Sequence, residues 1–481
     1  MRNKIFYTSF FLLSFFLLSS CGKAIEGDLI ISNINIIDVE TGKIDSGMDL
    51  IIIKDRIMSI VPHRKKLTYN AETIVDGTGK FLIPGLWDMH VHLSMIGKES
   101  IPLFVLNGVT GVRDMGGNWS ELEEWRALGN LTEQNVYPKI KTAGPILESP
   151  QFYNLLQQIL GPSYTNDRIA ISSIEQAHIV VDSLSKMGAD LIKVRTVKSQ
   201  EIFKAIAAAC KKNNIPFTGH IDQNIGIEFA IENKMQTIEH DLFLQSLSMD
   251  EKGLNKTLQT ITDGRLNFTP TLLATYNSRL RSKDELIQLA NDTLNRKTEF
   301  REYLSPKLIE NWNIQLKIQA LETPMKWDSL IIPLRSFAKS IAGKTTVLSG
   351  TDCGVPGIIP GKGLHQELKM LVEEMGLSNL QALQASTINA VRNLELQNEY
   401  GLVKSLYRAD LLILNENPLE DISSSSNIFS IIRNGTILDQ NEIKTRYNNL
   451  AADVRSSNEY YTPEILNHLR EVLDNMNSGS K

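Results

Sequence analysis

Two histidines, His90 and His92, stand one residue apart in the sequence. On a β-strand, side chains two positions apart point to the same face, so this pair presents two imidazoles to one point in space. Imidazole is the commonest protein metal ligand near neutral pH. Two histidines with ordinary hydrogen bonds on a polar strand face would give the same short pattern. The apolar run 81–87 leads directly into the pair, which favours the end of an interior strand and therefore a metal site.

Four more residues with metal-binding chemistry follow apolar runs in the long middle of the chain. Lys193 lies near the end of one run, His220 and His240 end the next two, and Asp352 ends the last. In a barrel of parallel strands the active site lies at the carboxyl ends of the strands, where these side chains would converge. Any one of these histidines alone would more often be structural. Their joint placement with Asp352 indicates a metal site.

The elements that must position these residues are repeated β-α units. Short apolar runs alternate with helix-like segments such as 201–213 and 226–233, which is typical of a parallel sheet. Eight such runs predict an α/β fold with a (β/α)8 TIM barrel. The expected strands are residues 86–92, 110–114, 139–143, 191–195, 216–220, 236–239, 267–271 and 346–351.

Both ends of the chain contain β-rich segments, at 28–61 and at 408–433, with turn residues between the short apolar runs. They predict a small β-sandwich domain formed from both chain ends. The expected organisation is a signal peptide at 1–20, sandwich segments at 21–82 and 396–445, the barrel at 83–395, and a C-terminal helix or tail at 446–481.

The N-terminus has the features of an export signal. Arg2 and Lys4 precede an apolar stretch at 10–18, which is shorter than the roughly 20 residues that span a bilayer. The small residues before Cys21 resemble a bacterial lipobox, which implies a lipidated Cys21 at the mature N-terminus. The expected protein is exported and lipid-anchored to a bacterial cell membrane, periplasmic or surface-facing. A plain signal peptide with an incidental cysteine is the alternative.

The composition is that of an ordinary globular protein, with 42% apolar and 22% charged residues among 481. A formal charge of -5 gives no basic surface of the kind that binds nucleic acid, so no nucleic-acid partner is expected. The sequence leaves a homo-oligomer open.

The candidate ligands stand in an ordered set of motifs. These comprise residues 85–92, 108–116 and 350–352, the strand of Lys193, His220, and the pair Glu239-His240. The set resembles the amidohydrolase superfamily, and most closely its imidazolonepropionase-like and Xaa-Pro-dipeptidase-like branch. The resemblance covers roughly residues 28–440 and is less specific for substrate than for the superfamily.

The resemblance implies a divalent metal, expected to be zinc, with one or two ions per chain. A lysine ammonium has no lone pair for a metal, whereas a carbamate formed with carbon dioxide is an anion with two oxygens that can bridge ions about 3.5–4 Å apart. The implied ligands are His90, His92 and Asp352 for one ion and His220 and His240 for the other, with carbamylated Lys193 as the bridge if two ions bind.

The implied reaction is hydrolysis of an amide bond in a small substrate such as a dipeptide or an N-acyl amino acid. Metal-activated hydroxide would attack the carbonyl, with Asp352 as general acid and base. Arg195 follows Lys193 by two residues and should share its face, where it could bind a substrate carboxylate or form a salt bridge within the barrel. Hydrolysis of a cyclic, imidazolone-like amide is an alternative. A catalytically silent surface binding protein is disfavoured because every ligand position is filled.

Three neighbours of these residues are expected to be structural. Glu239 precedes His240, so its side chain should point to the opposite strand face, as a packing residue or as a partner of a ligand. Arg113 and Asp114 are expected to pair with each other. Cys353 is interpreted as a small buried residue, because the metal already supplies the nucleophile.

Overall fold

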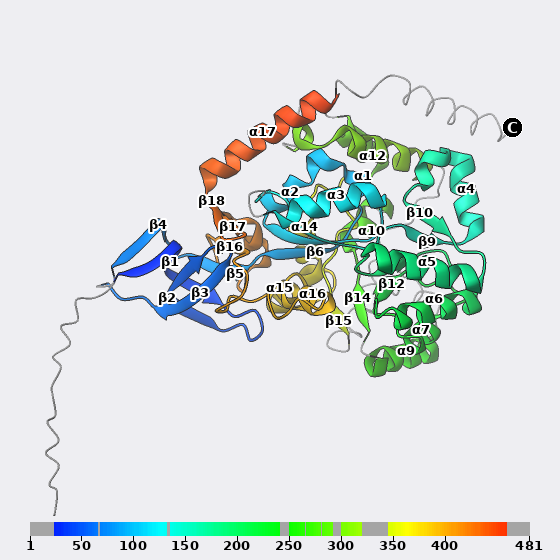
Figure 1. The fold of residues 1–481 in the computed structure, drawn as a ribbon, viewed down its shortest axis with the longest axis horizontal. Helices are drawn as coiled ribbons and strands as arrows, with labels where there is room; N and C mark the ends of the chain where they lie inside the picture. Colours follow the sequence, from blue (N-terminus) through cyan, green and yellow to red (C-terminus); the bar gives the residue numbers. More distant parts are fainter. Residues whose placement is uncertain are drawn as a thin grey trace, which may run out of the picture.

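The computed structural model describes residues 24–65, 68–131, 135–240, 250–264, 266–279, 281–291, 300–319 and 345–458. A mixed β-sheet lies at one end of the molecule, and the helices gather around the parallel strands of the remainder (Figure 1). Cys21 and the expected export signal lie outside the described residues, as do residues 459–481 of the expected C-terminal helix or tail. Lipidation, export and the domain boundaries therefore stay predictions.

The mixed sheet is built from both ends of the chain and has eight strands, in the order β18-β17-β16-β5-β1-β2-β3, with β4 paired to β1. The two ends meet where β5 pairs antiparallel with β16, which places Leu82 opposite Ile413. The expected sandwich is thus a single mixed sheet. Its strands are β1 (Ile25–Ile37), β2 (Ile44–Ile53), β3 (Arg56–Pro62), β4 (Tyr69–Asp76), β5 (Phe81–Pro84), β16 (Leu411–Leu414), β17 (Ile428–Arg433) and β18 (Thr436–Leu438).

The chain passes from the mixed sheet into the parallel strands at Gly85. A Cβ atom at this position would lie 2.2 Å from Oγ1 of Thr110. Only glycine lets the backbone pass this close to its neighbour. The run at 81–87 is therefore two strands, one in each part of the molecule.

All eight strands expected in the middle of the chain are present. Six of them end before the predicted residue, whereas those expected at 110–114 and 236–239 end where predicted. Three of them form one sheet, β6 (Leu86–Val91), β7 (Val109–Asp114) and β8 (Lys139–Thr142), and the other five lie in a seven-stranded parallel sheet that also contains two strands not expected from the sequence. The seven-stranded sheet contains, in order, β10 (Arg168–Ala170), β9 (Ile146–Glu148), β11 (Ile192–Val194), β12 (Phe217–Gly219), β13 (Thr237–Glu239), β14 (Asn267–Thr269) and β15 (Thr346–Val347).

The predicted barrel is confirmed only in part, because the described strands do not form one closed ladder. Isolated backbone hydrogen bonds connect the two sheets. The amide of Asp190 donates to the carbonyl of Thr142 (2.9 Å), and the amide of Met89 donates to the carbonyl of Ser349 (2.8 Å). The unexpected strand β9 pairs with β11 at Val194, and this pairing replaces a ladder between β8 and β11.

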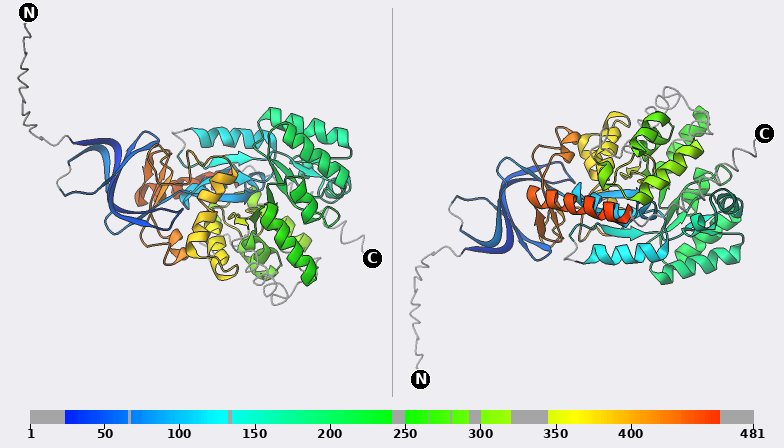
Figure 2. Two further views of the ribbon diagram at one scale, coloured as in Figure 1. Left: turned by 90° about the horizontal axis from the view of Figure 1, so that it is seen from below. Right: turned by 90° about the horizontal axis from the view of Figure 1, so that it is seen from above.

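Amphipathic helices cover the parallel strands. In α6 (Gln200–Lys212), for example, Phe203, Ile206 and Cys210 are buried on one face, and Ser199 caps the first turn. The helix α17 (Gln440–Asn458, red in Figure 2) packs against α2 (Pro102–Leu106) and α12 (Pro306–Gln319). No helix in the described ranges is long and apolar enough to cross a membrane.

The helices are α1 (Leu93–Ile96), α2 (Pro102–Leu106), α3 (Trp119–Asn130), α4 (Pro150–Leu160), α5 (Ile174–Met187), α6 (Gln200–Lys212), α7 (Ile227–Glu232), α9 (Glu251–Gly264), α10 (Leu272–Arg279), α11 (Lys283–Ala290), α12 (Pro306–Gln319), α14 (Lys362–Glu373), α15 (Asn379–Ala385), α16 (Ile388–Asn393) and α17 (Gln440–Asn458). Short 3₁₀ helices cover Lys98–Ser100, Pro162–Thr165, Arg301–Tyr303 and Ile422–Ser426.

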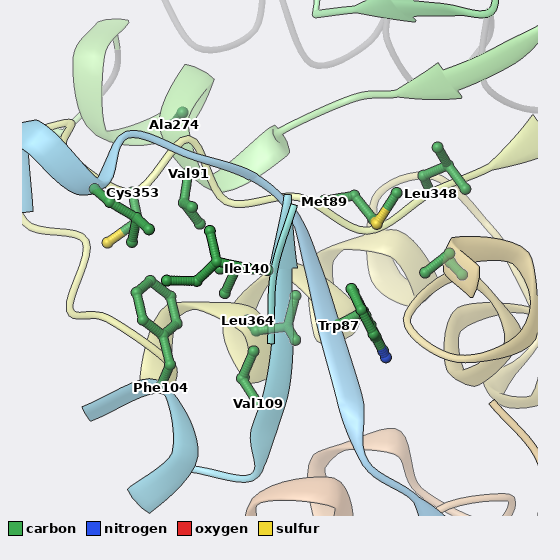
Figure 3. Close-up of a cluster of buried hydrophobic side chains, with 14 of the residues drawn as sticks. Trp87, Met89, Val91, Phe104, Val109, Ile140, Ala274, Leu348, Cys353 and Leu364 are labelled. Atoms are coloured by element: carbon green, nitrogen blue, oxygen red, sulfur yellow. The ribbon is translucent and has the colours of Figure 1, made fainter. Parts of the chain in front are cut away.

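The side chains of strand β6 alternate between the hydrophobic core and the opposite face of the strand, which carries the polar residues. Trp87, Met89 and Val91 pack in the hydrophobic core (Figure 3). Asp88 and His90 alternate with them and point to the other face, although both are also fully buried. A histidine at the end of a buried strand is thereby held in one orientation by the packing of its neighbours.

Candidate metal centre

His90 and His92 each use one ring nitrogen for a structural hydrogen bond. Nδ1 of His90 lies 2.9 Å from Oε2 of Glu239, and Nδ1 of His92 lies 3.1 Å from the carbonyl oxygen of Gly116. Both acceptors require a proton on Nδ1, which leaves the lone pair of Nε2 available. The two imidazoles are thus prepared to bind a cation through Nε2.

Asp352 lies opposite these two nitrogen atoms. Its Oδ1 is 3.5 Å from Nε2 of His90 and 3.3 Å from Nε2 of His92. One ligand atom from each of the three residues lies within 4.8 Å of the other two, which is compatible with a single bound metal ion. Asp352 has a φ of 55°, an uncommon value for a residue other than glycine. The backbone turn after β15 therefore aims the carboxylate at the histidines.

A second pair of imidazoles lies next to Asp352. Nε2 of His240 is 3.1 Å from Nε2 of His220 and 4.0 Å from Oδ2 of Asp352. Nδ1 of His240 is hydrogen-bonded to Oγ1 of Thr271. Burial lowers the pKa of His240 to about 4, so this imidazole is neutral at pH 7 and can donate a lone pair to a metal.

Lys193 lies among these histidines and is itself buried, with 1% of its surface exposed. Burial and then the charge of Lys193 lower the pKa of His90 and of His220. Burial likewise lowers the pKa of Lys193 to about 8. The amine is therefore far easier to deprotonate than an exposed lysine.

The donor set fits a divalent cation. Within the described part of the chain, Nε2 of His90 and Nζ of Lys193 are buried and have no hydrogen-bond partner. Buried polar atoms are rarely left unpaired, so two such atoms in one cluster point to a missing partner. A metal ion would supply that partner for Nε2 of His90, and a carbamate on Lys193 would replace its unpaired ammonium with an anionic ligand. The residues of the site thus suit a divalent metal ion.

Arg195 follows β11 and lies at the edge of this centre. Its guanidinium is 3.3 Å from Oε1 of the buried Glu148 and stacks on the ring of Phe152 at 4.8 Å, and the Arg195 side chain as a whole is 33% exposed. Arg168 and Thr196 also donate to Glu148. The salt bridge within the barrel, which was one of the two roles expected for Arg195, is therefore present, and the side chain is partly exposed.

Two expectations about neighbouring residues are wrong. The direction expected of Glu239 is wrong, because it and His240 both contact His90, although its expected role as the partner of a ligand is confirmed by the hydrogen bond to His90. The φ of His240 is 39°, which breaks the alternation expected of an extended strand. Arg113 pairs with Glu239 at 2.7 Å, and Asp114 instead accepts hydrogen bonds from the amides of Leu93 and Gly116.

The sequence analysis missed Asp88. Its carboxylate accepts hydrogen bonds from the amide of Thr351 (3.0 Å) and from its hydroxyl (2.6 Å). Burial raises the pKa of Asp88 to about 7. Asp88 thereby fixes the residue that precedes Asp352. Asp88 could have been predicted from the sequence. It stands two residues before His90 in an apolar run, so its carboxylate must lie on the same buried face of the strand as the imidazole of His90.

The pattern of the Amidohydrolase family matches residues 173–439, which are 267 of the 481 residues. The chain therefore belongs to the amidohydrolase family, as its motifs suggested, and is a hydrolase that acts on carbon–nitrogen bonds. Ochratoxinase from Aspergillus niger is 24% identical over 424 residues, which cover 77% of this chain and 78% of that protein.

Solved structures share the fold. A Xaa-Pro dipeptidase with bound methionine in its active site has a TM-score of 0.61 and 19% identity, over 85% of this chain and 99% of that chain. A prolidase complexed with N-methylphosphonate-L-proline has a TM-score of 0.61 and 20% identity, over 85% of this chain and 99% of that chain. The fold is thus that of the Xaa-Pro-dipeptidase-like proteins, the branch that the motifs resemble.

Proposed function

We propose that this protein is a metal-dependent hydrolase of amide bonds in small substrates that carry a free carboxylate, such as dipeptides or N-acyl amino acids. One observation carries the proposal. Nε2 of His90 and Nε2 of His92 both face Oδ1 of Asp352, while both Nδ1 atoms are occupied by structural hydrogen bonds.

The ion is proposed to be zinc, because a set of imidazoles and carboxylates suits this metal. When bound, it would polarise the amide carbonyl and lower the pKa of water. His90, His92 and Asp352 would hold one ion. Carbamylated Lys193 would allow a second ion to be held with His220 and His240.

Asp352 is proposed to move the proton. Its two oxygen atoms face different imidazoles, Oδ1 toward His92 and Oδ2 toward His240. Burial opposes the ionisation of Asp352, but the histidines around it outweigh burial and hold its pKa well below the ordinary value. An ionised carboxylate can accept a proton from the attacking water and deliver it to the leaving nitrogen.

Arg195 is proposed to bind the substrate carboxylate. A guanidinium can form two parallel hydrogen bonds with a carboxylate, and Glu148 accepts a hydrogen bond from one terminal nitrogen of Arg195, Nη1. The relatives support this substrate class, because the solved dipeptidase contains methionine and the solved prolidase contains a proline derivative. Both ligands carry a carboxylate.

Export and lipid anchoring through Cys21 are proposed from the sequence alone. The lipid would hold the hydrolase at a bacterial membrane and leave the centre open to small substrates outside the cytoplasm.

The test combines metal analysis with a substrate panel. We expect the purified full chain, loaded with Zn²⁺ in bicarbonate, to hydrolyse dipeptides or N-acyl amino acids and to lose activity with a chelator. Turnover of cyclic amides alone would contradict the substrate proposal. A zinc-loaded protein that hydrolyses no amide at all would contradict the function.

A further inference from the structure

We propose that Arg113 is a positioning residue that acts through Glu239 to hold His90 in its metal-binding orientation and so sets the affinity for the metal. This inference rests on the metal centre in the proposed function. It adds a role for a residue that contacts none of the candidate ligands by a hydrogen bond of its own side chain in the described structure.

Arg113 comes from β7 and is fully buried. Its Nε donates to the carbonyl of Met89 (2.7 Å), and one terminal nitrogen donates to Oδ1 of Asn393 (3.2 Å). The other terminal nitrogen donates to Oε1 of Glu239 (2.7 Å) and to Thr269 (3.2 Å). A guanidinium buried with partners on four different elements has one permitted position, because every alternative would leave donors unpaired.

Glu239 is fixed in turn by what its two oxygens contact. Oε1 accepts from Arg113 (2.7 Å) and from the hydroxyl of Thr218 (2.6 Å). Oε2 has Nδ1 of His90 at 2.9 Å. Both oxygens are therefore engaged, and Glu239 is not available as a metal ligand. The carboxylate cannot rotate away from His90 without breaking the hydrogen bonds of Oε1.

The consequence for His90 is a defined ring orientation. The hydrogen bond to Glu239 requires the proton on Nδ1, so Nε2 keeps its lone pair directed at Asp352. Without Arg113, the buried charge of Glu239 would lack its counter-ion, and the carboxylate would be free to turn toward other donors. His90 would then lose the partner that fixes its tautomer and its ring.

The test is the dissociation constant for Zn²⁺, measured on the full chain by competition with a chromophoric chelator. Replacing a partner that orients a metal ligand typically costs about 10- to 100-fold in metal affinity. We expect Glu239→Gln to fall in this range and Arg113→Gln to weaken binding about tenfold. We expect the double variant to bind zinc as Glu239→Gln alone does, because Arg113 acts through Glu239.

Arg433 provides the matched control. It is also a fully buried arginine, and it binds both oxygens of Asp410 within the mixed sheet. Arg433→Gln should lower stability with no change in the dissociation constant for zinc. A merely structural role for Arg113 predicts the same result for Arg113→Gln, and that result would overturn the proposal.

Arg113→Lys keeps the charge and loses the fork of donors. If Arg113→Gln does not fold, a several-fold loss of zinc affinity in Arg113→Lys supports the relay, and wild-type affinity overturns it. Losses that add in the double variant, or a wild-type chain that binds no zinc, overturn it as well. Tight zinc binding without amide hydrolysis contradicts the proposed function and leaves this comparison of affinities intact.

Discussion

Nε2 of His92 lies 3.3 Å from Oδ1 of Asp352. His92 follows the first strand of the parallel region and Asp352 follows the last, so this contact spans the seam between the two sheets. Among the described residues, the backbone hydrogen bonds across the same seam are isolated, such as that from the amide of Asp352 to the carbonyl of His90 (2.7 Å), and hydrogen bonds from Thr351 to the side chain of Asp88 join them. A metal ion bound by His92 and Asp352 would add a connection between the two sheets at the place where few backbone hydrogen bonds join them.

The first prediction follows from this position. Chelation should lower the midpoint of thermal unfolding by several degrees, because a ligand present at 100 times its dissociation constant stabilises the folded state by about 2.7 kcal/mol. Differential scanning calorimetry with and without Zn²⁺ measures the shift. His92→Ala should abolish the zinc-dependent gain, whereas His63→Ala, which removes a histidine bonded to Asp49 in the mixed sheet, should keep it. Equal unfolding midpoints with and without zinc in the wild-type chain would show that no metal ion stabilises the contact between His92 and Asp352.

Asp352→Asn tests the proton transfer. The amide can still offer an oxygen to the metal but cannot accept the proton, so turnover should fall by about 10²- to 10⁴-fold with the ion retained. Single-turnover kinetics and metal analysis on the same sample give both values. Asp410→Asn serves as the control, since Asp410 is a buried, arginine-paired aspartate in the mixed sheet, and it should keep near-normal turnover. Persistent turnover in metal-loaded Asp352→Asn would rule out the assigned role.

Arg195→Gln tests the substrate carboxylate. Hydrogen bonds to charged groups contribute about 1.5–3 kcal/mol, so KM should rise about 10- to 100-fold for a dipeptide and change little for its C-terminal carboxamide. Arg168 also pairs with Glu148, and its side chain is largely buried. Arg168→Gln should therefore change KM equally for the dipeptide and for its carboxamide. An equal effect of Arg195→Gln on both substrates would show that Arg195 only supports the wall of the site.

Glu367 gives the protein a pH-dependent stability. Burial raises the pKa of this carboxyl from 4.5 to about 8, although the amides of Leu273 and Leu272 hydrogen-bond to it. A carboxyl with a raised pKa in the folded state stabilises the protein below the unfolded pKa and loses that contribution as pH rises through the folded value. The free energy of unfolding should therefore decrease between about pH 5 and pH 8, with a limiting slope of about 1.4 kcal/mol per pH unit from this group.

Urea unfolding at several pH values checks this slope. Glu367→Gln cannot titrate, so the difference in unfolding free energy between wild type and variant should change with pH in the same window. A constant difference would show that Glu367 is already ionised, with the two backbone amides and the start of α10 outweighing its burial.

The strands could be predicted because each one is an apolar run between turn residues. For example, the apolar residues before Asp352 predict a strand at 346–351, and β15 lies within this range. The placement of His220 and His240 at strand ends followed from the same runs. The pairing of β9 with β11 could not be predicted, because three-residue strands carry almost no periodic signal and their partners depend on the whole sheet.

The side-chain network was harder to predict than the strands. The expectation for Glu239 assumed a regular extended strand, and a left-handed residue at His240 removes that assumption. Arg113 was paired with its neighbour in sequence, whereas its partner comes from β13. Sequence proximity suggests an ion pair, but a buried guanidinium is positioned by the donors and acceptors that surround it in three dimensions.

The metal content of the purified full chain tests the central claim most directly. We expect close to two zinc ions per chain when the protein is prepared with bicarbonate, and fewer for Lys193→Ala, because loss of the carbamate removes the bridge. About one ion per chain, unchanged in Lys193→Ala, would show that a carbamate on Lys193 is not a metal ligand. No bound ion in the wild-type chain, with Nε2 of His90 and of His92 still facing Asp352, would contradict the metal centre itself.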